Sequence, residues 1–424
     1  MGAIDAMVTR ASTVRQAEVS AGSHSLGGAL PWKTIVPGTA AVAAQALSEA
    51  RVSGHAVVPW GSGTAQAMGA LPDRYDVSCS TAGMASVVEY EPADLVVSVG
   101  AGLTIGAVQS TLREHGQFLA LDGVDRNATI GGVLATNRSG PSRLLYGTAR
   151  DLVLGITVAL PNGEVVKSGG RVVKNVVGYD LNKLHIGALG TLGVICEVTV
   201  KVHPLPRAEA SVVGRFTSSE AANTVAHSLA RSNLALRAVD VTTDLTDPPA
   251  AFTTSVGVWC SGWPASVERQ VREVSTAFRS AFATSVDMLT GDDHTALRDR
   301  VEARRMLPCR VKIAVLPDKL GNAQLEVANA LRDAAFPDGT WVARAGVGVA
   351  HIGVRTLDAP LLARLRQIAE AAGGTCVTEA SPDSLRTPEQ VWGRPRDDFR
   401  IMTRIRDEFD PSRTINPGRF VGAL

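Results

Sequence analysis

The chain has 424 residues, of which 45% are hydrophobic and 20% charged, a composition of folded globular proteins rather than disordered ones. The 42 lysines and arginines nearly balance 41 aspartates and glutamates, and no basic cluster stands out, which argues against nucleic acid as a partner. No run of 18 apolar residues occurs, so no transmembrane segment is expected. The five cysteines are widely spaced, which argues against zinc or iron–sulfur sites and fits a reducing cytoplasm.

Predicted elements begin after a loose N-terminal arm over residues 1–32. The segment TAAVAAQALSEARV predicts a helix that stops at Gly54, and AVVP then predicts a short strand running into the loop WGSGT. Between residues 94 and 206, apolar strands alternate with glycine-rich loops. Within that stretch, Asn162-Gly163 between two apolar runs predicts a hairpin with a type I′ turn.

After Pro206 the pattern changes to strands that alternate with amphipathic helices. Helices are expected from Ser219, from Ala265 and from Leu320, and the segment APLLARLRQIAEAA predicts another. WVARAGVGVAHIGV predicts a pair of antiparallel strands, so this part is expected to be one sheet covered by helices. The tail, from residue 395, predicts a helix at FRIMTRIRDEF and a closing extended segment.

One glycine cluster is similar to a dinucleotide-binding turn. A strand precedes Gly100-Ala-Gly102, a third glycine follows at Gly106, and Asp122 comes about twenty positions later, as in βαβ nucleotide sites. The third glycine is one place late for that fingerprint. Two interpretations remain open at this point: a nicotinamide or adenine site, and a structural turn whose glycines let a helix pack closely.

Three other glycine clusters together favour a cofactor site. Trp60-Gly61-Ser62-Gly63-Thr64 follows a strand and can form an anion nest for a pyrophosphate. Gly131-Gly132 lies where a helix is expected to begin, so free N–H groups are predicted to point toward a phosphate or an electron-rich ring. Gly187, Gly190 and Gly193 surround Thr191 before another strand.

The chain-order combination PWGSGT, PADLVVSVGAG, TIGGVLATNRSGPSRLLYG, GGRVVKNVVGYDLNKL, GALGTLGVICEVTVKVHPLP and FDPSRTINPGRF resembles FAD-binding oxidoreductases of the vanillyl-alcohol oxidase type. Within them it is most similar to the E-type FAD-binding chain of bacterial glycolate oxidase. The resemblance implies an α+β fold: a two-subdomain PCMH-type FAD-binding domain over 33–208, then an α+β substrate or cap domain with an antiparallel sheet over 209–394. It also implies that the segment 395–424 returns to the FAD domain and that the turn at Gly100 is structural.

The resemblance also implies which residues hold FAD. The loop from Trp60 to Thr64 would bind the pyrophosphate, although relatives often have Arg where Trp60 stands. Thr64 replaces a histidine that tethers the flavin in some relatives, and no cysteine lies near Gly131, so non-covalent FAD is expected. The implied cofactor residues are Trp60, Gly61, Ser62, Gly63, Thr64, Thr129, Ile130, Gly131, Gly132, Ala135, Thr136, Asn137, Gly140, Tyr146, Gly147, Gly190, Thr191, Gly193, Val194, Ile195 and Asn416.

Catalytic candidates are fewer. Arg310, which opens the strand RVKIAVLP, resembles an arginine that faces the flavin in this branch and is a candidate anchor for a substrate carboxylate. His351 is a single histidine where related enzymes carry a metal-binding cluster, so it is either catalytic or a satisfied core histidine, and no metal site is expected. Lys174 and Tyr179 either border the flavin or shape a loop. Asp292-Asp293-His294 lies at an expected helix start and fits an N-cap.

These observations favour an FAD-dependent oxidoreductase acting on CH–OH groups. The expected reaction oxidises a small 2-hydroxy acid such as glycolate or lactate, with hydride passing to flavin N5 and electrons to a partner subunit, a quinone or another acceptor. The expected location is the cytoplasm, with any membrane association coming through a partner. Two alternatives stay open: a non-catalytic FAD-binding partner subunit, and an NAD-dependent dehydrogenase that uses the segment Gly100–Gly106.

Overall fold

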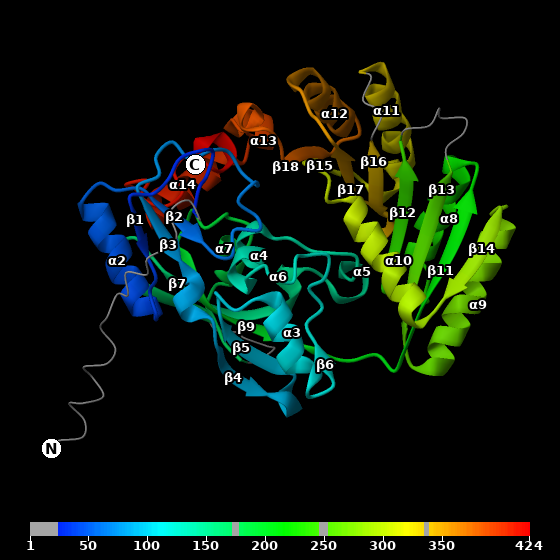
Figure 1. Cartoon of the computed structure of the whole chain (residues 1–424), viewed down its shortest axis with the longest axis horizontal. Coiled ribbons are helices and arrows are strands. Elements are labelled where there is room, and N and C mark those ends of the chain that lie inside the picture. Colours follow the sequence, from blue (N-terminus) through cyan, green and yellow to red (C-terminus); the bar gives the residue numbers. More distant parts are fainter. Residues whose placement is uncertain (1–23, 172–177, 246–252, 335–338) are drawn as a thin grey trace.

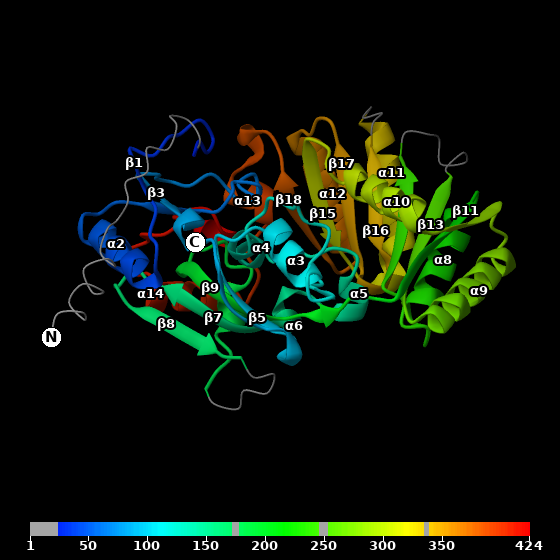
Figure 2. The ribbon, with the colours of Figure 1, turned by 60° about the horizontal axis from the view of Figure 1, so that its bottom comes forward.

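The computed structural model describes residues 24–171, 178–245, 253–334 and 339–424. They form two bodies placed end to end along the long axis of the molecule (Figure 1). The first body contains the chain up to about residue 205 together with the C-terminal helix α14, and the second contains one large sheet with its helices, as a second view also shows (Figure 2). The fold is a mixture of helices and mainly antiparallel sheets, which confirms the predicted α+β class. Most of the predicted N-terminal arm lies outside the described residues.

The first body is built on two sheets. A small parallel sheet has the strand order β1-β3-β2, and an antiparallel sheet has the order β4-β5-β9-β7-β8, while β6 pairs with β10. The strands are β1 Lys33–Ile35, β2 Val57–Trp60, β3 Val77–Ser80, β4 Val87–Glu91, β5 Val96–Gly100, β6 Gln117–Phe118, β7 Val153–Ala159, β8 Val165–Gly169, β9 Val194–Lys201 and β10 His203–Pro204. The helices are α2 Ala40–Val52, α3 Ile105–Arg113, α4 Ile130–Thr136, α5 Arg143–Tyr146, α6 Ala149–Leu152, α7 Asn182–His185, α13 Pro388–Trp392 and α14 Phe399–Phe409.

The predicted helix before Gly54 is confirmed as α2. Thr39 caps its N-terminus by accepting a hydrogen bond from the Val42 N–H, which satisfies one of the amides that a helix start leaves unpaired. Its buried alanines and Leu47 pack in the core between the parallel and the antiparallel sheet. Gly54 follows with φ +71°, the left-handed conformation that ends helices.

The predicted hairpin is confirmed as the antiparallel pair β7–β8, but the expected type I′ turn is wrong. The Gly163 N–H donates to Leu160 O at 3.1 Å, so Pro161 and Asn162 occupy the central positions of the turn. Proline fixes a negative φ, whereas a type I′ turn needs positive φ at both central positions. Only Gly163, with φ +93°, takes up the left-handed conformation here.

The second body is one antiparallel sheet of order β14-β11-β13-β12-β16-β17-β15-β18. Its strands are β11 Ala208–Phe216, β12 Ala238–Asp244, β13 Thr254–Gly262, β14 Ser285–Leu289, β15 Cys309–Ala314, β16 Thr340–Arg344, β17 Val349–Val354 and β18 Thr375–Ala380. Its helices are α8 Ser219–Ala230, α9 Pro264–Ser280, α10 Gly291–Arg304, α11 Leu320–Asp333 and α12 Ala359–Ala371. The helices predicted from Ser219, Ala265 and Leu320 and at APLLARLRQIAEAA are thereby confirmed to within one residue at their starts.

The two faces of this sheet differ in chemistry because side chains alternate along each strand. Helices α8, α9, α11 and α12 cover one face, where Val311, Trp341 and Ile352 belong to the largest hydrophobic core. The opposite face, toward α10 and the first body, carries polar residues such as Arg344 and His351. Since this polar face packs against the first body, its charged side chains lie at the junction between the two bodies.

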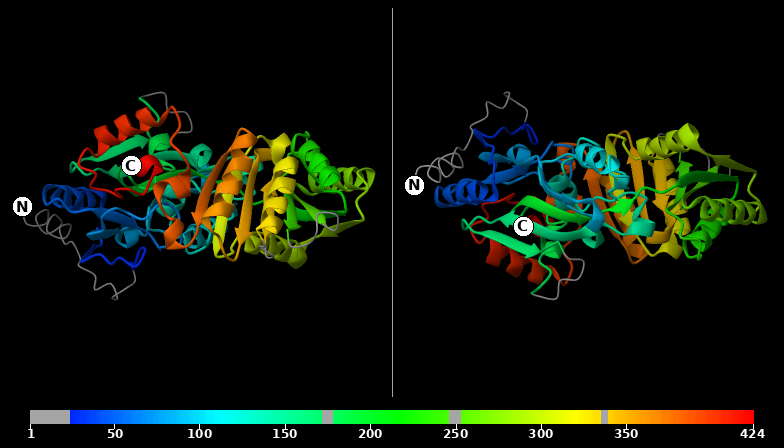
Figure 3. Two further views of the ribbon diagram at one scale, coloured as in Figure 1. Left: turned by 90° about the horizontal axis from the view of Figure 1, so that it is seen from above. Right: turned by 90° about the horizontal axis from the view of Figure 1, so that it is seen from below.

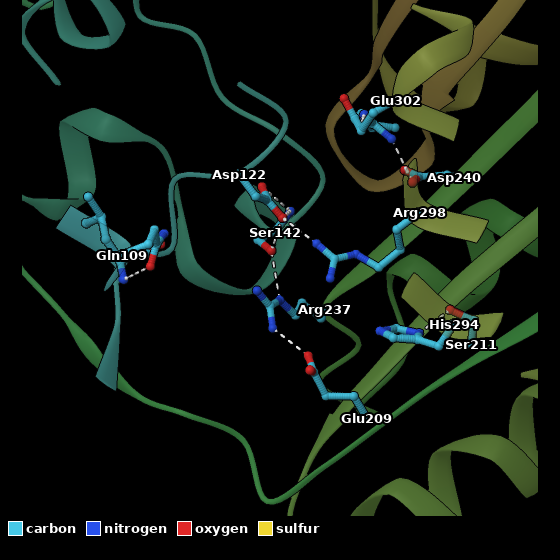
Figure 4. A network of polar contacts seen from close by, with 12 residues as sticks. Gln109, Asp122, Ser142, Glu209, Ser211, Arg237, Asp240, His294, Arg298 and Glu302 are labelled. Atoms are coloured by element: carbon cyan, nitrogen blue, oxygen red, sulfur yellow. Dashed lines mark hydrogen bonds and ion pairs between the residues drawn. The ribbon is translucent and has the colours of Figure 1, made fainter. Parts of the chain in front are cut away.

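Polar contacts join the two bodies (Figure 4). Arg237, directly before β12, donates from Nε to the Ser142 hydroxyl at 2.8 Å and forms an ion pair with Glu209 at 2.8 Å. Its guanidinium also lies 3.6 Å from the ring centroid of Trp259. On the first body, the Ser142 hydroxyl donates to the Asp122 carboxylate, which faces Arg298 of α10 at 3.9 Å. A buried cation held by these partners fixes how the sheet sits on the first body.

The turn at Gly100 is structural, so the nicotinamide alternative is wrong. Strand β5 pairs antiparallel with β4 and β9, and the strand after α3, β6, belongs to another sheet. A dinucleotide-binding unit requires two parallel strands in one sheet. A Cβ on Gly102 would lie 2.0 Å from the Thr81 carbonyl oxygen, which explains the glycine by close packing. The Asp122 carboxylate accepts a hydrogen bond from the Ser142 N–H, so it has a structural partner in place of a ribose.

The C-terminal segment lies against the first body, as views from above and below show (Figure 3). Ile415 forms a parallel bridge with Val57 of β2, and the Asn416 N–H donates to Val57 O at 2.9 Å. Inside this segment Arg406 and Asp410 form a fully buried ion pair at 3.2 Å. Among the helices of the described ranges, none has the length and apolarity needed to cross a membrane.

Candidate functional site

A cavity lies where the loop after β2, helix α4, the turn before β9 and the C-terminal segment meet. Fifteen of the residues implied as cofactor ligands line it: Trp60, Gly61, Ser62, Gly63, Thr64, Thr129, Gly131, Gly132, Ala135, Thr136, Gly190, Gly193, Val194, Ile195 and Asn416. Residues that the sequence did not single out complete its wall, namely Pro59, Ala65, Gln66, Met68, Thr81, Leu189 and Arg419. Three glycine-rich clusters far apart in sequence therefore share one cavity, which we call the first cavity.

Two buried arginines shape the loop after β2. Arg419 donates to the carbonyl oxygens of Gln66, Met68 and Ala70 at 3.0, 2.7 and 3.2 Å. Arg386 donates to the carbonyl oxygens of Gln66 and Gly69 at 2.8 and 3.3 Å. Because buried carbonyl groups are costly when unpaired, these bonds hold the loop open in one conformation.

Arg419 also brings positive charge to the cavity wall. It is 4% exposed and has no carboxylate partner among the described residues. Burial, reinforced by the neighbouring charge of Arg386, lowers the pKa of Arg419 to about 9, so it stays charged at neutral pH. The tryptophan at position 60 suggested that this loop lacks a cationic contact, whereas Arg419, from the other end of the chain, places a cation in the wall of the same cavity.

The expectation of free N–H groups at the start of α4 is wrong. The Ile130 and Gly131 N–H groups donate to Leu103 O and Ala101 O, both at 2.9 Å. The Gly132 N–H donates to the side chain of Thr129, the N-cap, at 3.2 Å. The helix start is therefore saturated by the Gly100 turn and by its own cap. Gly132 instead leaves space in the cavity for a ligand, because a Cβ at this position would approach only Thr129 Oγ1, at 3.1 Å.

The wall opposite α4 carries an unpaired buried acceptor. Asn416 has φ +47° and donates from its amide nitrogen to Leu189 O at 2.6 Å. Its amide oxygen Oδ1 is buried without a hydrogen-bond partner among the described residues. Since a buried unpaired oxygen is costly, a ligand with a donor group facing it would be favoured. The glycine lining, the cation and this acceptor fit a ligand that carries both an anionic group and a hydrogen-bond donor.

Six implied cofactor residues do not line the first cavity: Ile130, Asn137, Gly140, Tyr146, Gly147 and Thr191. Ile130 is fully buried in the core, and the Thr191 hydroxyl donates to Ala188 O at 2.7 Å. Tyr146 stacks edge-on against Phe118 instead. Gly140 and Gly147 are explained by packing, because a Cβ on either would overlap Asp122 or Asp151.

A second cleft begins where the first cavity ends, and Thr136 lines both. From the first body it is lined by Thr136, Asn137, Arg138, Ser139 and Arg143, and from the second by Arg305, Lys312, Arg344, Val349, His351 and Glu379. Asn137 enters it because it ends α4 in the left-handed conformation, with φ +48°. The polar face of the large sheet thus closes over the end of α4.

His351 and Glu379 form the centre of the second cleft. His351 Nδ1 lies 3.3 Å from Glu379 Oε2, and Lys312 Nζ lies 4.0 Å from Glu379 Oε1. Burial, with the charge of Arg305, lowers the pKa of His351 to about 4, so the ring is neutral at pH 7. Burial alone would raise the pKa of Glu379, but His351, Lys312 and Arg305 outweigh it and hold that pKa well below its usual range. An ionised Glu379 favours the tautomer with the proton on Nδ1, which leaves Nε2 as an acceptor.

The other catalytic candidates lie in different places. Arg310 is on the same strand and face as Lys312 but is not among the residues that line the second cleft. Its Nη1 donates to Leu307 O at 3.2 Å, and its buried Nε has no hydrogen-bond partner among the described residues. Lys174 lies outside the described residues. Tyr179 is 93% exposed, so its side chain reaches neither cavity. Thr290, not Asp292-Asp293, is the N-cap of α10, and His294 is buried in that helix with Nδ1 2.8 Å from the Ser211 hydroxyl.

Sequence reasoning missed most charged residues of the second cleft. Lys312 follows Arg310 by two positions, so strand alternation would have placed it on the same face. Arg344 and Glu379 each lie at the end of an apolar strand, a pattern too common to single them out. Arg305 just follows a helix. Only the long-range pairing of β15 with β17 and β18 brings these side chains together.

Comparisons with known proteins identify a family and several relatives. A family described as FAD binding domain matches residues 31–169. The chain is 25% identical to the glycolate oxidase subunit GlcD of Bacillus subtilis over 394 residues, covering 86% of this chain and 83% of that protein. It is 36% identical to the glycolate oxidase subunit GlcE of Escherichia coli over 153 residues, covering 36% of this chain and 43% of that protein.

A third relative matches only in part. The mitochondrial D-lactate dehydrogenase [cytochrome] 1 of Saccharomyces cerevisiae is 35% identical over 188 residues, covering 44% of this chain and 32% of that protein. Among solved structures, an alkyldihydroxyacetonephosphate synthase superposes with a TM-score of 0.67 at 15% identity, covering 91% of this chain and 77% of that one. At that identity the superposition establishes the shared fold and nothing more.

Proposed function

Because the chain belongs to the FAD-binding oxidoreductases, with an FAD binding domain over residues 31–169, we propose that it oxidises a small 2-hydroxy acid such as glycolate or lactate. In this proposal the first cavity holds FAD without a covalent link, and the second cleft holds the acid. The observation that carries the proposal is that both spaces have Thr136 in their walls, and that the second is also lined by the His351–Glu379 pair. Relatives named as glycolate oxidase subunits and D-lactate dehydrogenases support the choice of substrate.

The residues of the first cavity would hold FAD by shape and charge. The loop from Trp60 to Thr64, with Arg419 behind it, suits the pyrophosphate, and the space beside Gly132 suits the chain that leads to the ring. When bound, FAD supplies N5 as the acceptor of a hydride from a C–H bond. Asn137 and Ser139, just after α4, line the second cleft and would be available to contact the cofactor from that side.

The residues of the second cleft divide the remaining tasks. His351, neutral at pH 7, accepts the proton of the substrate hydroxyl as the C–H bond breaks, which converts the 2-hydroxy acid into a 2-oxo acid. Glu379 orients the ring and stabilises its protonated form. Lys312, in the cleft wall, and Arg310, two positions earlier on the same strand face, offer cations for the carboxylate, which is present in both substrate and product. Their contribution is mainly binding and orientation.

We infer that a partner subunit, a quinone or another external acceptor takes up the electrons from the reduced cofactor. Relatives named as subunits of glycolate oxidase support a multi-subunit setting. An isolated chain should then turn over slowly with oxygen and faster with an artificial acceptor dye or with the partner present.

The proposal is tested by mixing the FAD-loaded chain with glycolate or either enantiomer of lactate in the absence of oxygen. Loss of the visible absorbance of oxidised flavin is expected with at least one acid. Arg310→Lys should raise KM for that acid about tenfold and lower kcat less, because one point charge replaces a two-pronged grip. An unchanged KM would show that Arg310 does not bind the substrate carboxylate, and Lys312 would then be the residue assigned to it. No bleaching by any 2-hydroxy acid, with bleaching after addition of a partner subunit, would make this chain the non-catalytic FAD-binding subunit.

A further inference from the structure

The second cleft holds more positive charge than one carboxylate requires. Arg138, Arg143 and Arg310 have no ion pair with a carboxylate within the described ranges. The other cations of the cleft are compensated: Lys312 faces Glu379 at 4.0 Å, Arg344 lies 2.6 Å from Asp240, and Arg305 lies 2.5 Å from Glu302. Three guanidinium groups therefore lie in or beside the cleft without a direct ion pair, although the charge of Asp151 acts on Arg143 and that of Glu379 acts on Arg310.

The strand register separates these charges into two groups. In β15 and β17, Arg310 pairs with Gly353 and Lys312 with His351, while Arg344 of β16 pairs with Val349. Gly353 and Val349 are each two residues from His351. At about 3.3 Å per residue, the two arginine levels lie roughly 7 Å on either side of the histidine along the strands.

Each level faces a second arginine from the first body. Arg138 lines the cleft, and its charge, after burial, lowers the pKa of Arg310; we call these two residues the Arg310 end. Burial lowers the pKa of Arg143 as well, and the charge of Arg344 adds to that effect against the opposing charge of Asp151. Arg143 and Arg344 form the Arg344 end. Like charges that face one another across a junction are unfavourable unless an anion lies between them.

A simple monocarboxylate can neutralise only one of the two ends. Arg344 already forms ion pairs with Asp240 and Glu302, so the cation at its end that lacks a direct ion pair within the described ranges is Arg143. A substrate whose reacting carbon lies at His351 and whose carboxylate lies at the Arg310 end would extend its far end toward Arg143. An apolar far end would leave that cation partly desolvated and unpaired.

We propose that the substrate is a 2-hydroxy acid with a second anionic group, a carboxylate or a phosphate, which binds at the Arg344 end through Arg143. This inference rests on the proposed function and narrows its substrate class. Arg143 is then a specificity-determining residue and takes no part in the chemistry. Its guanidinium gives a two-pronged contact to either kind of anion.

Binding of product analogues to the oxidised holoenzyme tests this inference without turnover. The dissociation constant of 2-oxoglutarate is compared with that of 2-oxovalerate, which has the same chain length and a methyl group in place of the second carboxylate. A charge-assisted contact predicts binding at least about tenfold tighter for the diacid. Hydroxypyruvate and its 3-phosphate, which are also 2-oxo acids, form a second pair that tests a phosphate, and a gain in either pair supports the proposal.

Two variants localise the effect. Arg143→Gln should bring the preferred pair to within about threefold of equality, whereas Arg332→Gln, which removes an exposed arginine on α11 of the covered sheet face, should keep the wild-type ratio. Equal binding within both pairs by the wild-type protein would overturn the inference, and so would a preference that survives in Arg143→Gln.

Failure of the inference and failure of the proposed function give different results. If 2-hydroxybutyrate reduces the flavin and no anionic preference is found, the proposed function stands and the inference falls. If no 2-hydroxy acid, with or without a second anionic group, reduces the flavin of the chain or of its complex, the proposed function falls and the inference falls with it.

Discussion

His351 Nδ1 lies 3.3 Å from Glu379 Oε2, and both side chains are buried on the sheet face that closes the second cleft. The histidine belongs to β17 and the glutamate to β18, with β15 between them in the sheet. Lys312 of that middle strand approaches the same carboxylate from the other side. Three strands thus present one neutral histidine whose second nitrogen is available to a ligand.

Replacing this histidine should remove most of the activity. His351→Asn is expected to lower kcat by roughly 10²- to 10⁴-fold, the usual effect of losing a general base, with a smaller change in KM. His115→Asn, which alters an exposed histidine of the first body, serves as the control. Steady-state kinetics with an artificial electron acceptor measure both variants. Wild-type kcat in His351→Asn would assign proton removal to another group.

The pH dependence of kcat/KM gives an independent view of the same residue. Because His351 must be neutral to accept a proton and its pKa is lowered to about 4, the rate should remain level as pH falls from 8 to 6. A decline is expected only as pH approaches that lowered value. Stopped-flow reduction of the flavin at each pH avoids slow unfolding. A decline centred near 6.5, the ordinary histidine value, would contradict the assignment.

Gly132→Asp should remove FAD and leave the protein folded. The new side chain would enter the first cavity, where only Thr129 Oγ1 lies near the Cβ position, and its negative charge would face an anionic cofactor. The matched control is Gly38→Asp, at an exposed position with open space around the Cβ. Flavin absorbance per protein and Tm of the apoprotein measure the two effects. Equal FAD content in both variants would show that the cofactor does not bind beside α4.

Gly102→Ala would not serve as a control for the Gly132 variant, because this substitution is expected to destabilise the fold. A Cβ at that position would lie 2.0 Å from the Thr81 carbonyl oxygen and 2.7 Å from its carbonyl carbon. Backbone atoms cannot move aside as a flexible side chain can. We therefore expect this variant to lower the unfolding free energy of the whole first body, and any loss of FAD with it.

Arg419→Met should weaken FAD binding by about tenfold or more. The change removes the buried cation of the first cavity and leaves carbonyl groups of residues 66–70 without donors. Arg386→Met is the matched control, since Arg386 holds the same loop through Gln66 and Gly69 without lining the cavity. Both variants should have a lower Tm. Equal loss of FAD affinity in the two would show that only loop geometry matters, and that the charge of Arg419 contributes nothing.

FAD should leave the protein when it is denatured. Thr64 stands in the cavity wall, and the cysteines nearest the cavity, Cys79 and Cys196, are buried. Burial also raises the pKa of Cys196 to about 12, so its reactive thiolate is scarce. Acid precipitation is expected to yield a colourless pellet and FAD in the supernatant. A yellow pellet would reveal a covalent link.

Mild acid should destabilise the fold through buried histidines. Burial lowers the pKa of His185 to about 4, so between about pH 6.5 and 4 the unfolded chain binds a proton that the native chain does not. The unfolding free energy then falls with pH, by up to ~1.4 kcal/mol per pH unit for such a group. His185→Leu should therefore lose less Tm between pH 7 and 5 than the wild type does. A parallel loss in both would assign the acid sensitivity elsewhere.

The sequence predicted the elements better than it predicted the electrostatics of the site. Strong local signals, such as the cap and stop of α2 or the proline and glycine of the β7–β8 turn, place elements because they depend on neighbouring residues. The interpretation of the Gly100 turn depended on sheet pairing, which a local glycine pattern does not determine. Family resemblance then supplied most residues of the first cavity, including Asn416 from the far end of the chain.

The residues that sequence reasoning missed depend on contacts across the chain. Arg419 reaches the loop at Gln66 from about 350 positions away, and Glu379 meets His351 only because β15 lies between their strands. Arg138 and Arg143 come from the first body and face arginines of the second. No local pattern marks such a residue, because its role is set by what packs against it.

The most direct test of the account is a single anaerobic turnover of the isolated, FAD-loaded chain with a 2-hydroxy acid, in which the 2-oxo acid formed is counted against the flavin reduced. Oxidation in the second cleft predicts one 2-oxo acid for each flavin that bleaches. Two results would contradict the claim that this chain oxidises 2-hydroxy acids. One is bleaching of the flavin without formation of a 2-oxo acid, and the other is the absence of both bleaching and 2-oxo acid with the full set of mono- and dianionic 2-hydroxy acids.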